Sequence, residues 1–181
     1  MRQLYLIRHG KTAANEAHLY CGRSDVPLCA AGEAELRALH YELPPARFLT
    51  SGMKRTEQTL ALLFGQVPHR TVPAFREINF GRFELHAYEE LKADPDYQAW
   101  ITGDNHRNVP PGGESGAQME QRVLAALEAL EDVPTVLVTH GGVIACIMAR
   151  LFPGENKNRY QWQPKPGHGY AVYEDHYEVI P

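Results

Sequence analysis

The stretch Leu4-Tyr5-Leu6-Ile7-Arg8-His9-Gly10 decides the fold. Leu4 to Ile7 form a short, uninterrupted apolar run, which is typical of a strand buried on both faces of a parallel sheet. Arg8 and His9 stand where that strand would end. A second apolar strand is predicted over 133–139, and it is followed by His140 and glycine, as the first is. We therefore predict two strands that each carry a histidine at the carboxyl end.

Helical segments alternate with these strands. Apolar residues at helical spacing, together with good helix formers, predict helices over residues 31–41, 54–64, 115–130 and 143–151. Further short strands are predicted at residues 47–50, 170–173 and 177–180. This alternation predicts an α/β fold with a mainly parallel central sheet and helices on both faces. In such sheets ligands bind at the carboxyl ends of the strands, where both histidines are expected.

The region from about 85 to 111 is the least regular part of the chain. It contains prolines and glycine, which interrupt regular structure, and three aromatic residues, Tyr88, Tyr97 and Trp100. We predict a single domain over 1–181 in which this region is a small helical insert over the active site. At least two of the three aromatic side chains are expected to fill the core of the insert, although an aromatic or sugar-bearing substrate could also use them.

Composition excludes several classes of protein. The 181 residues are 44% hydrophobic and 22% charged, which is typical of a globular domain. The net charge of -4 gives no general attraction to nucleic acid or anionic lipid, so we expect neither as a partner. No apolar run reaches the length that spans a bilayer, and the amino-terminal run is too short for a secretion signal. We therefore expect a cytoplasmic protein.

Cysteine and histidine patterns argue against a metal or another cofactor. The three cysteines lack C-x-x-C spacing, which disfavours both a disulfide framework and a zinc site. The nine histidines include no H-E-x-x-H pair. The glycine-rich signatures of nucleotide-binding loops are missing too. We expect no metal and no cofactor.

Two arginines and two histidines could together bind a phosphate monoester. Arg8 and Arg55 can each grip a phosphoryl group with a forked pair of donors, and either His9 or His140 could attack phosphorus or donate a proton. Taken singly, each has an ordinary structural explanation. An arginine at the start of a helix is nevertheless unfavourable unless an anion is near. Physical reasoning alone does not assign Glu77.

The chain resembles the histidine phosphatase superfamily, which includes phosphoglycerate mutases. The resemblance rests on five motifs in family order: Arg8-His9-Gly10-Lys11-Thr12 with Asn15, Ser51-Gly52-Met53-Lys54-Arg55 with Thr59, Arg76-Glu77-Ile78-Asn79-Phe80-Gly81, Gly112-Gly113-Glu114-Ser115 and Thr139-His140-Gly141-Gly142. The resemblance implies that His9 accepts the phosphoryl group without a metal. It also implies that Arg8, Arg55 and His140 complete the phosphate pocket, and that Glu77 is the proton donor.

The same resemblance supplies the remaining expected binding residues and a substrate. The phosphate and substrate would be bound by Arg8, Asn15, Cys21, Gly22, Arg55, His140 and Gly141. The segment from Tyr20 to Leu28, followed by Gly32, looks like the α-ribazole phosphatases of cobalamin assembly. We therefore expect a phosphatase for a small phosphorylated metabolite, with α-ribazole 5'-phosphate as the first choice.

Three departures from the family pattern and several alternatives remain. Phe83-Glu84-Leu85 stands where the family often has Trp-Glu-Gly, Lys11 replaces a frequent glutamate and makes the entrance more basic, and Cys29 replaces a capping Ser or Thr. The alternatives are a broad-specificity sugar or phosphoglycerate phosphatase, a phosphoglycerate mutase, or a catalytically silent phosphate-binding regulatory module. The compact insert favours a phosphatase over a mutase. Whether the protein forms a homodimer is left open.

Overall fold

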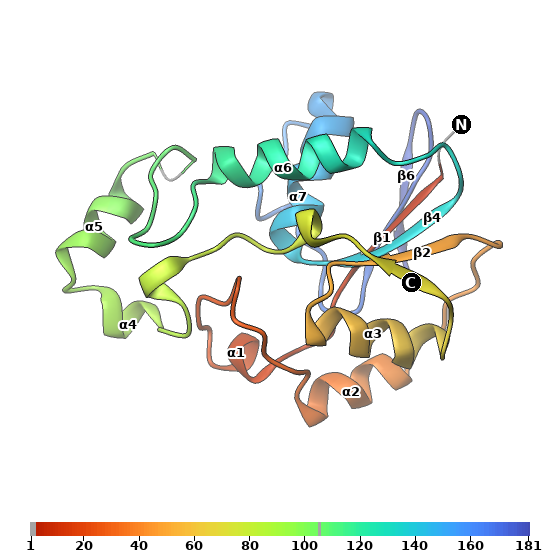
Figure 1. The fold of residues 1–181 in the computed structure, drawn as a ribbon, viewed down its shortest axis with the longest axis horizontal. Helices are drawn as coiled ribbons and strands as arrows, with labels where there is room; N and C mark the ends of the chain where they lie inside the picture. The colour runs from red at the N-terminus through yellow and green to blue at the C-terminus, as the bar shows by residue number, and fades with distance from the viewer. Residues whose placement is uncertain (1–2, 105) are drawn as a thin grey trace.

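The computed structural model describes residues 3–104 and 106–181, and within them a six-stranded sheet forms the centre (Figure 1). The strands are β1 (Leu4–Arg8), β2 (Arg47–Thr50), β3 (His69–Thr71), β4 (Thr135–Thr139), β5 (Gly169–Val172) and β6 (Tyr177–Ile180). Their order is β3-β2-β4-β1-β5-β6. The first four run parallel, and the pair β5-β6 closes one edge in antiparallel register. The predicted fold class, with its mainly parallel sheet, is confirmed.

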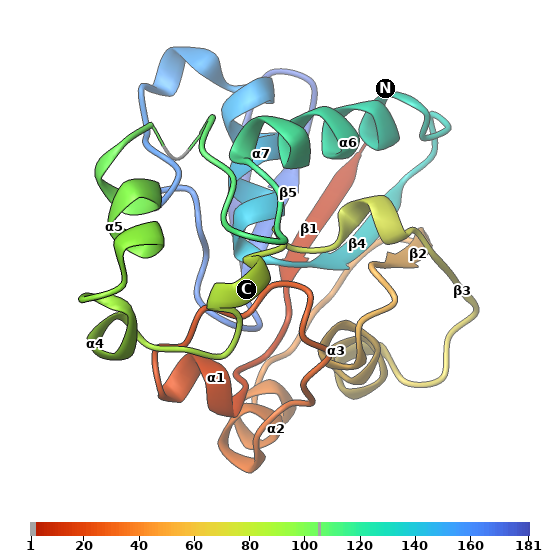
Figure 2. The same ribbon diagram turned by 60° about the vertical axis from the view of Figure 1, so that its left-hand side comes forward.

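Helices cover both faces of this sheet. They are α1 (Ala13–Glu16), α2 (Ala30–Arg37), α3 (Lys54–Phe64), α4 (Tyr88–Leu91), α5 (Pro95–Thr102), α6 (Gly116–Glu128) and α7 (Gly141–Leu151), with short 3₁₀ turns η1 (Pro73–Phe75), η2 (Gly81–Phe83) and η3 (Pro153–Glu155). Figures 1 and 2 show α6 and α7 on one side of the sheet and α2 and α3 on the other. Both faces are therefore shielded from water, which explains the apolar runs at residues 4–7 of β1 and 136–138 of β4.

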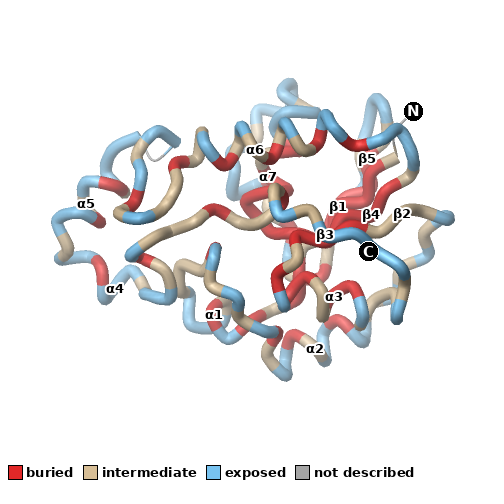
Figure 3. The backbone as a smooth tube through the Cα atoms, viewed as in Figure 1, coloured by how far each residue is buried: buried red, intermediate tan, exposed pale blue. Residues whose placement is uncertain are grey.

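The alternation of side chains along β1 divides the core into two halves. Leu4 and Leu6 pack with α6 and α7, whereas Tyr5 and Ile7 pack on the opposite face near α3. Each such buried aliphatic side chain contributes about 1.5–3 kcal/mol of transfer free energy. Figure 3 shows the buried backbone concentrated in the central strands and α7. The core thus lies directly beneath the strand ends that carry the histidines.

The predicted elements agree with the structure except at short or polar segments. The helix expected over 31–41 ends at Arg37, and α1 and β3 were not predicted. Helix α1 has only four residues, and all three residues of β3 are exposed and polar, so neither carries hydrophobic periodicity. Cys29 does cap α2, because its sulfur accepts a hydrogen bond from the Gly32 backbone at 3.4 Å.

The region predicted as an insert has a small core of its own. Tyr97 and Trp100 of α5 are buried with Phe83 and Leu91, whereas Tyr88 is exposed. The expectation that at least two of the three aromatic residues fill this core is confirmed. The boundaries 85–111 and the description as one domain with an insert remain a proposal. Within residues 3–104 and 106–181, no helix is both long and apolar enough to cross a membrane.

Leu85 is held in the left-handed backbone region, at a φ of 60°. Its amide donates to the Tyr20 carbonyl at 2.7 Å, which fixes the chain in this conformation. A left-handed backbone costs a non-glycine residue about 1–2 kcal/mol. The family resemblance places glycine at this position, so the departure noted in the sequence coincides with a strained residue.

We predict that Leu85→Gly stabilises the protein by about 1 kcal/mol, because relief of strain exceeds the added entropy of the unfolded chain. The residue is 43% exposed, and the comparison with Leu85→Ala removes the effect of the burial lost with the side chain. Urea unfolding measures the effect. Leu85→Ala is the matched control, since it keeps the strained Cβ, and a Leu85→Gly variant no more stable than Leu85→Ala would contradict the account.

Candidate active site

The pairing of β1 with β4 brings the two predicted histidines together. Arg8 pairs with Thr139 in parallel register, and the His9 amide donates to the Thr139 carbonyl at 2.9 Å. His9 and His140 therefore leave the sheet side by side, with ring centroids 5.2 Å apart and planes at 65°. Both side chains are buried, with exposed fractions of 6% and 0%. The site lies at the carboxyl ends of parallel strands, as predicted.

The hydrogen bonding of His9 determines which ring nitrogen can react. Its Nδ1 lies 2.7 Å from the carbonyl oxygen of Gly10. A carbonyl only accepts, so Nδ1 carries the proton and Nε2 presents its lone pair. Burial lowers the pKa of His9 well below its ordinary value, and the charges of Arg55 and Arg8 lower it further. His9 is thus a neutral imidazole with a free nucleophilic nitrogen.

His140 is oriented by a serine at the end of β2. The Ser51 hydroxyl lies 2.8 Å from His140 Nε2 and 3.1 Å from the Thr56 hydroxyl. His140 Nδ1 is buried and has no hydrogen-bond partner among the described residues. Burial, followed by the charge of Arg55, lowers the pKa of His140 well below its usual value. This ring is positioned on one nitrogen and leaves the other for a ligand.

Arg8 extends from the end of β1 beneath the start of α7. Its Nη1 donates to the Pro164 carbonyl at 2.8 Å, while its buried Nε has no partner within residues 3–104 and 106–181. Gly141 permits this close packing, because a Cβ there would lie 3.3 Å from the Arg8 guanidinium carbon and 2.7 Å from Gln163 Oε1. The guanidinium therefore keeps donors for an anion.

Arg55 is a fully buried cation in the first turn of α3, with only 1% of its surface exposed. Its Nη1 and Nη2 donate at 2.8 Å to the carbonyls of Ser24 and Gly22. In the described part of the chain no carboxylate forms an ion pair with it. Buried charges are normally paired. The unneutralised guanidinium makes this end of the sheet favourable for an anion.

Thr59 connects α3 to the loop that carries His9. Its hydroxyl donates to the Arg55 carbonyl at 2.6 Å and accepts from the Gly10 amide at 2.9 Å. One side chain thereby fixes the backbone of both the nucleophile loop and the Arg55 turn. This explains why Thr59 belongs to the second motif.

Glu77 lies against the amino terminus of α7. Its Oε2 accepts from the Gly142 amide at 2.9 Å, and its Oε1 accepts from the Ile78 amide at 3.0 Å. A Cβ on residue 142 would come within 2.3 Å of Glu77 Oε1, so glycine is needed for the carboxylate to reach this place. Glu77 thus lines the same cavity as Arg8.

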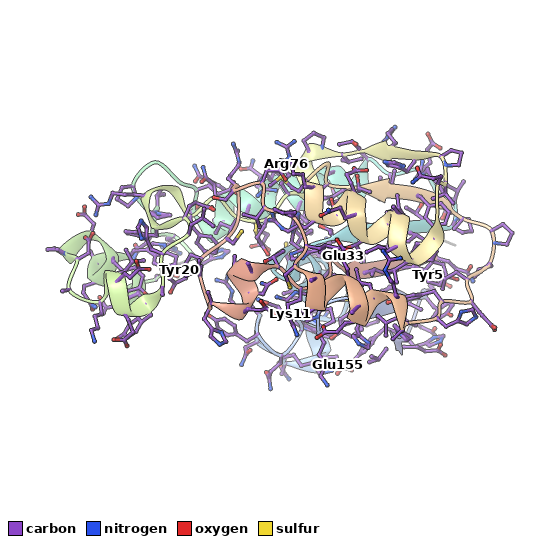
Figure 4. The ribbon with its side chains drawn as sticks, turned by 90° about the horizontal axis from the view of Figure 1, so that it is seen from below. Tyr5, Lys11, Tyr20, Glu33, Arg76 and Glu155 are labelled. Carbon is purple, nitrogen blue, oxygen red and sulfur yellow. The ribbon has the colours of Figure 1, made fainter. Side chains whose placement is uncertain are left out.

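Arg8 and Glu77 both line a cavity of about 240 Å³. Its lining combines a polar floor with aromatic walls: Arg8, Asn15, Leu19, Tyr20, Cys21, Glu77, Ile78, Phe80, Trp100, Ile101, Gly142, Arg159, Tyr160 and Gln163. Figure 4 places Tyr20 between the body of the protein and the α4–α5 region, where its hydroxyl bonds to that of Tyr97 at 2.7 Å. The α4–α5 region therefore forms one side of the cavity.

The structure brings most of the sequence-predicted site residues together. The carboxamide oxygen of Asn15 is bonded to the Thr12 amide and hydroxyl, which directs its NH₂ group as the atom available to a ligand. Cys21 lines the cavity. Gly22 instead acts through its carbonyl on Arg55. Of the predicted binding residues, Arg8, Asn15 and Cys21 line the cavity, whereas Gly22, Arg55, His140 and Gly141 are not among its lining residues.

Several other residues of the site were missed by the sequence analysis. Ser51 lay within a quoted motif without an assigned role, and Arg159, Tyr160 and Gln163 come from a segment without a recognisable pattern. Lys11 was expected to make the entrance more basic. It lies beside α2 (Figure 4) and pairs with Glu35 at 2.5 Å, so its charge is neutralised and it does not line the cavity.

Metal ligands do not gather in the described parts of the chain. Across 3–104 and 106–181, no three His, Cys, Asp or Glu side chains lie close enough to hold an ion together. The charged groups of the cavity are those given above.

Comparison with known proteins identifies the family. The family model of the histidine phosphatase superfamily (branch 1) matches residues 4–177. The chain belongs to this superfamily. The prediction of a phosphatase enzyme acting on a small phosphorylated substrate is thereby confirmed.

Individual relatives of this histidine phosphatase carry two kinds of name. An adenosylcobalamin/alpha-ribazole phosphatase of Salmonella typhimurium is 34% identical over 160 residues, which cover 82% of this chain and 79% of that protein. A "Probable phosphoglycerate mutase GpmB" of Yersinia enterocolitica is 31% identical, covering 83% and 75%. The crystal structure of a phosphoglycerate mutase from Thermus thermophilus superposes with a TM-score of 0.80 at 32% identity, covering 99% and 98%.

Proposed function

We propose that this histidine phosphatase hydrolyses α-ribazole 5'-phosphate through a phosphohistidine formed on His9. One observation carries the catalytic part of the proposal. The free Nε2 of His9 stands beside the cations Arg8 and Arg55, and two buried nitrogens, Arg8 Nε and His140 Nδ1, have no protein partner among the described residues. A phosphoryl group would accept a hydrogen bond from Arg8 Nε and meet the nucleophile, and a proton on that group or on Nδ1 would complete a bond to His140.

In the first step, the Nε2 lone pair of His9 forms a bond to phosphorus as the bond to the leaving oxygen breaks. Glu77 transfers its proton to that oxygen, so the alcohol leaves neutral. Arg8, Arg55 and His140 stabilise the charge on the equatorial oxygens. The Gly10 carbonyl accepts a hydrogen bond from His9 Nδ1 throughout, which stabilises the positive charge that develops on the ring.

In the second step, water attacks the phosphohistidine. The Glu77 carboxylate removes a proton from that water, the P–N bond breaks, and the electron pair returns to His9 Nε2. Inorganic phosphate leaves, and Glu77 is protonated again for the next turnover. The charges required in both steps are supplied by side chains.

The aromatic walls of the cavity support the choice of substrate. Tyr20, Phe80, Trp100 and Tyr160 offer ring surfaces beside the phosphate-binding groups. α-Ribazole carries an aromatic base on its ribose, and such a base packs well against aromatic side chains. The name of the Salmonella relative points to the same substrate.

Arg159 favours a second candidate. It is exposed at the cavity and could bind a carboxylate, as a phosphoglycerate would present. The Yersinia and Thermus relatives carry phosphoglycerate mutase names.

A sugar phosphatase or a silent regulatory module is a weaker alternative, because His9, His140, Arg8, Arg55 and Glu77 are all retained. We also propose a cytoplasmic location, which the three unpaired cysteines support.

A turnover panel tests the substrate. We expect α-ribazole 5'-phosphate to give a kcat/KM at least about tenfold above 3-phosphoglycerate, corresponding to about 1.4 kcal/mol of transition-state binding. Release of inorganic phosphate is measured, and interconversion of phosphoglycerates is followed in the same samples. Arg159→Gln separates the two candidates. It should weaken turnover of phosphoglycerate alone, and a preference for phosphoglycerate in the wild type would overturn the substrate assignment.

The nucleophile is tested by trapping the intermediate. Brief mixing with labelled p-nitrophenyl phosphate, followed by alkaline denaturation, should leave acid-labile, base-stable label on the wild type. His9→Ala should carry none and should lose at least about a thousandfold in kcat, whereas the exposed His40→Ala should behave as the wild type. The reaction should survive EDTA. Loss of activity with the chelator, or normal turnover by His9→Ala, would refute the mechanism.

The role of Glu77 is tested with leaving groups of different acidity. Glu77→Gln should slow hydrolysis of alkyl phosphates by about 10²–10⁴-fold, because poor leaving alcohols need a proton. p-Nitrophenyl phosphate should lose less in the first step, which a burst experiment resolves from the second. Equal first-step losses for both ester types would remove Glu77 from the role of proton donor.

A further inference from the structure

Glu84 accepts hydrogen bonds from all three backbone amides of the loop formed by residues 22–24. Its two oxygens accept from the backbone amides of Gly22 at 3.1 Å, Arg23 at 2.9 Å and Ser24 at 3.1 Å. They also accept from the Ser24 hydroxyl at 2.7 Å and the Phe80 amide at 3.0 Å. A carboxylate accepts about four hydrogen bonds, so this one is saturated.

The same loop holds Arg55 from its other side. The carbonyls of Gly22 and Ser24 accept from the two terminal nitrogens of Arg55 at 2.8 Å each. The peptide groups of the loop thus lie between two charged side chains. Their amides donate hydrogen bonds to the Glu84 carboxylate, and their carbonyls accept hydrogen bonds from the Arg55 guanidinium. Each charge polarises the peptides in the direction that strengthens the bonds to the other. Glu84 and Arg55 are linked without touching.

The loop has little freedom to compensate for a lost anchor. A Cβ on Gly22 would lie 1.6 Å from the Ile78 carbonyl oxygen, so the chain is pressed against the segment that follows Glu77. Beyond the loop, Asp25 accepts from the Lys54 amide at 2.7 Å, which ties it to the start of α3. Among the described residues, the Gly22, Arg23 and Ser24 amides are bonded only to Glu84.

We infer that Glu84 is a positioning residue that aims the Arg55 guanidinium at the phosphoryl group through residues 22–24. The inference rests on the proposed function, since it takes Arg55 to be a phosphate ligand. An amide at position 84 would turn an NH₂ group toward amide donors, which cannot bond to it. The loop would then move, and the Arg55 fork with it. A shorter carboxylate keeps the acceptors and restores part of the effect.

A double-mutant cycle on phosphate binding tests the inference. Inorganic phosphate is titrated calorimetrically into the wild type, Glu84→Gln, Arg55→Lys and the double variant. We expect Glu84→Gln to weaken binding at least about tenfold, because a charge-assisted contact to phosphate is misaligned. Lysine lacks the pair of terminal nitrogens that the two carbonyls bind in Arg55. In the Arg55→Lys background, Glu84→Gln should therefore weaken phosphate binding less than about threefold. Kinetics with p-nitrophenyl phosphate should show the same coupling in kcat/KM.

The control is Glu90→Gln, a carboxylate that caps α4 through the Ala87 amide at 2.7 Å and, within the described residues, has no hydrogen bond to residues 22–24. It should leave phosphate affinity within about twofold of the wild type. Circular dichroism verifies folding, and Glu84→Asp takes the place of Glu84→Gln in the cycle if the amide variant does not fold. Equal losses in both Arg55 backgrounds would overturn the inference, as would an unchanged affinity in Glu84→Gln.

The inference and the proposed function can fail separately. Phosphate binding does not require turnover, so a coupled cycle in a protein that forms no phosphohistidine would retain the role of Glu84 and refute the mechanism. Normal phosphohistidine turnover with an uncoupled cycle would do the reverse. A wild type that binds no phosphate would overturn both, because Arg55 would then have no phosphate to hold.

Discussion

The parallel pairing of β1 with β4 is the constraint on which the rest of the site depends. It fixes Arg8 opposite Thr139 and delivers His9 and His140 to the same edge of the sheet. Because β4 leads into α7 through His140, the same pairing also places the helix amino terminus beside His9. A register shift of one residue would turn His9 toward the opposite face of the sheet and separate the two rings.

The second requirement is positive charge that the protein itself does not neutralise. Arg55 is bonded to carbonyl oxygens and Arg8 to one, whereas a protein built only for stability would pair such cations with carboxylates. The cost appears in the depressed pKa values of both histidines, which burial and these charges cause. Burial, and after it the charges of Arg55 and Arg8, keep His9 unprotonated. The same uncompensated positive charge favours an anionic ligand at this edge of the sheet.

The sequence predicts most of what local pattern specifies, and little of what long-range contact specifies. Continuous apolar runs marked β1 and β4, and the residues directly after them were the two histidines. The link between Ser51 and His140 spans 89 positions, and the link between Glu84 and the loop at Gly22 spans 62, so neither leaves a periodic pattern. Arg159 reaches the cavity from an irregular segment, which offered no indication of its position.

The segment from Glu77 to Leu85 contacts both the start of α7 and the loop that binds Arg55. At one end, Glu77 accepts a hydrogen bond from the Gly142 amide. At the other end, Glu84 accepts hydrogen bonds from the loop whose carbonyls bind Arg55. Between them the Ile78 carbonyl packs against Gly22, so Glu77, the proposed proton donor, and the loop that bonds Arg55 are held by one short segment of backbone. Leu85, whose backbone is in the left-handed region, stands at the end of this segment. Its strain comes from a Cβ held in the left-handed backbone region, which glycine would relieve, and not from the hydrogen bonds of the two carboxylates.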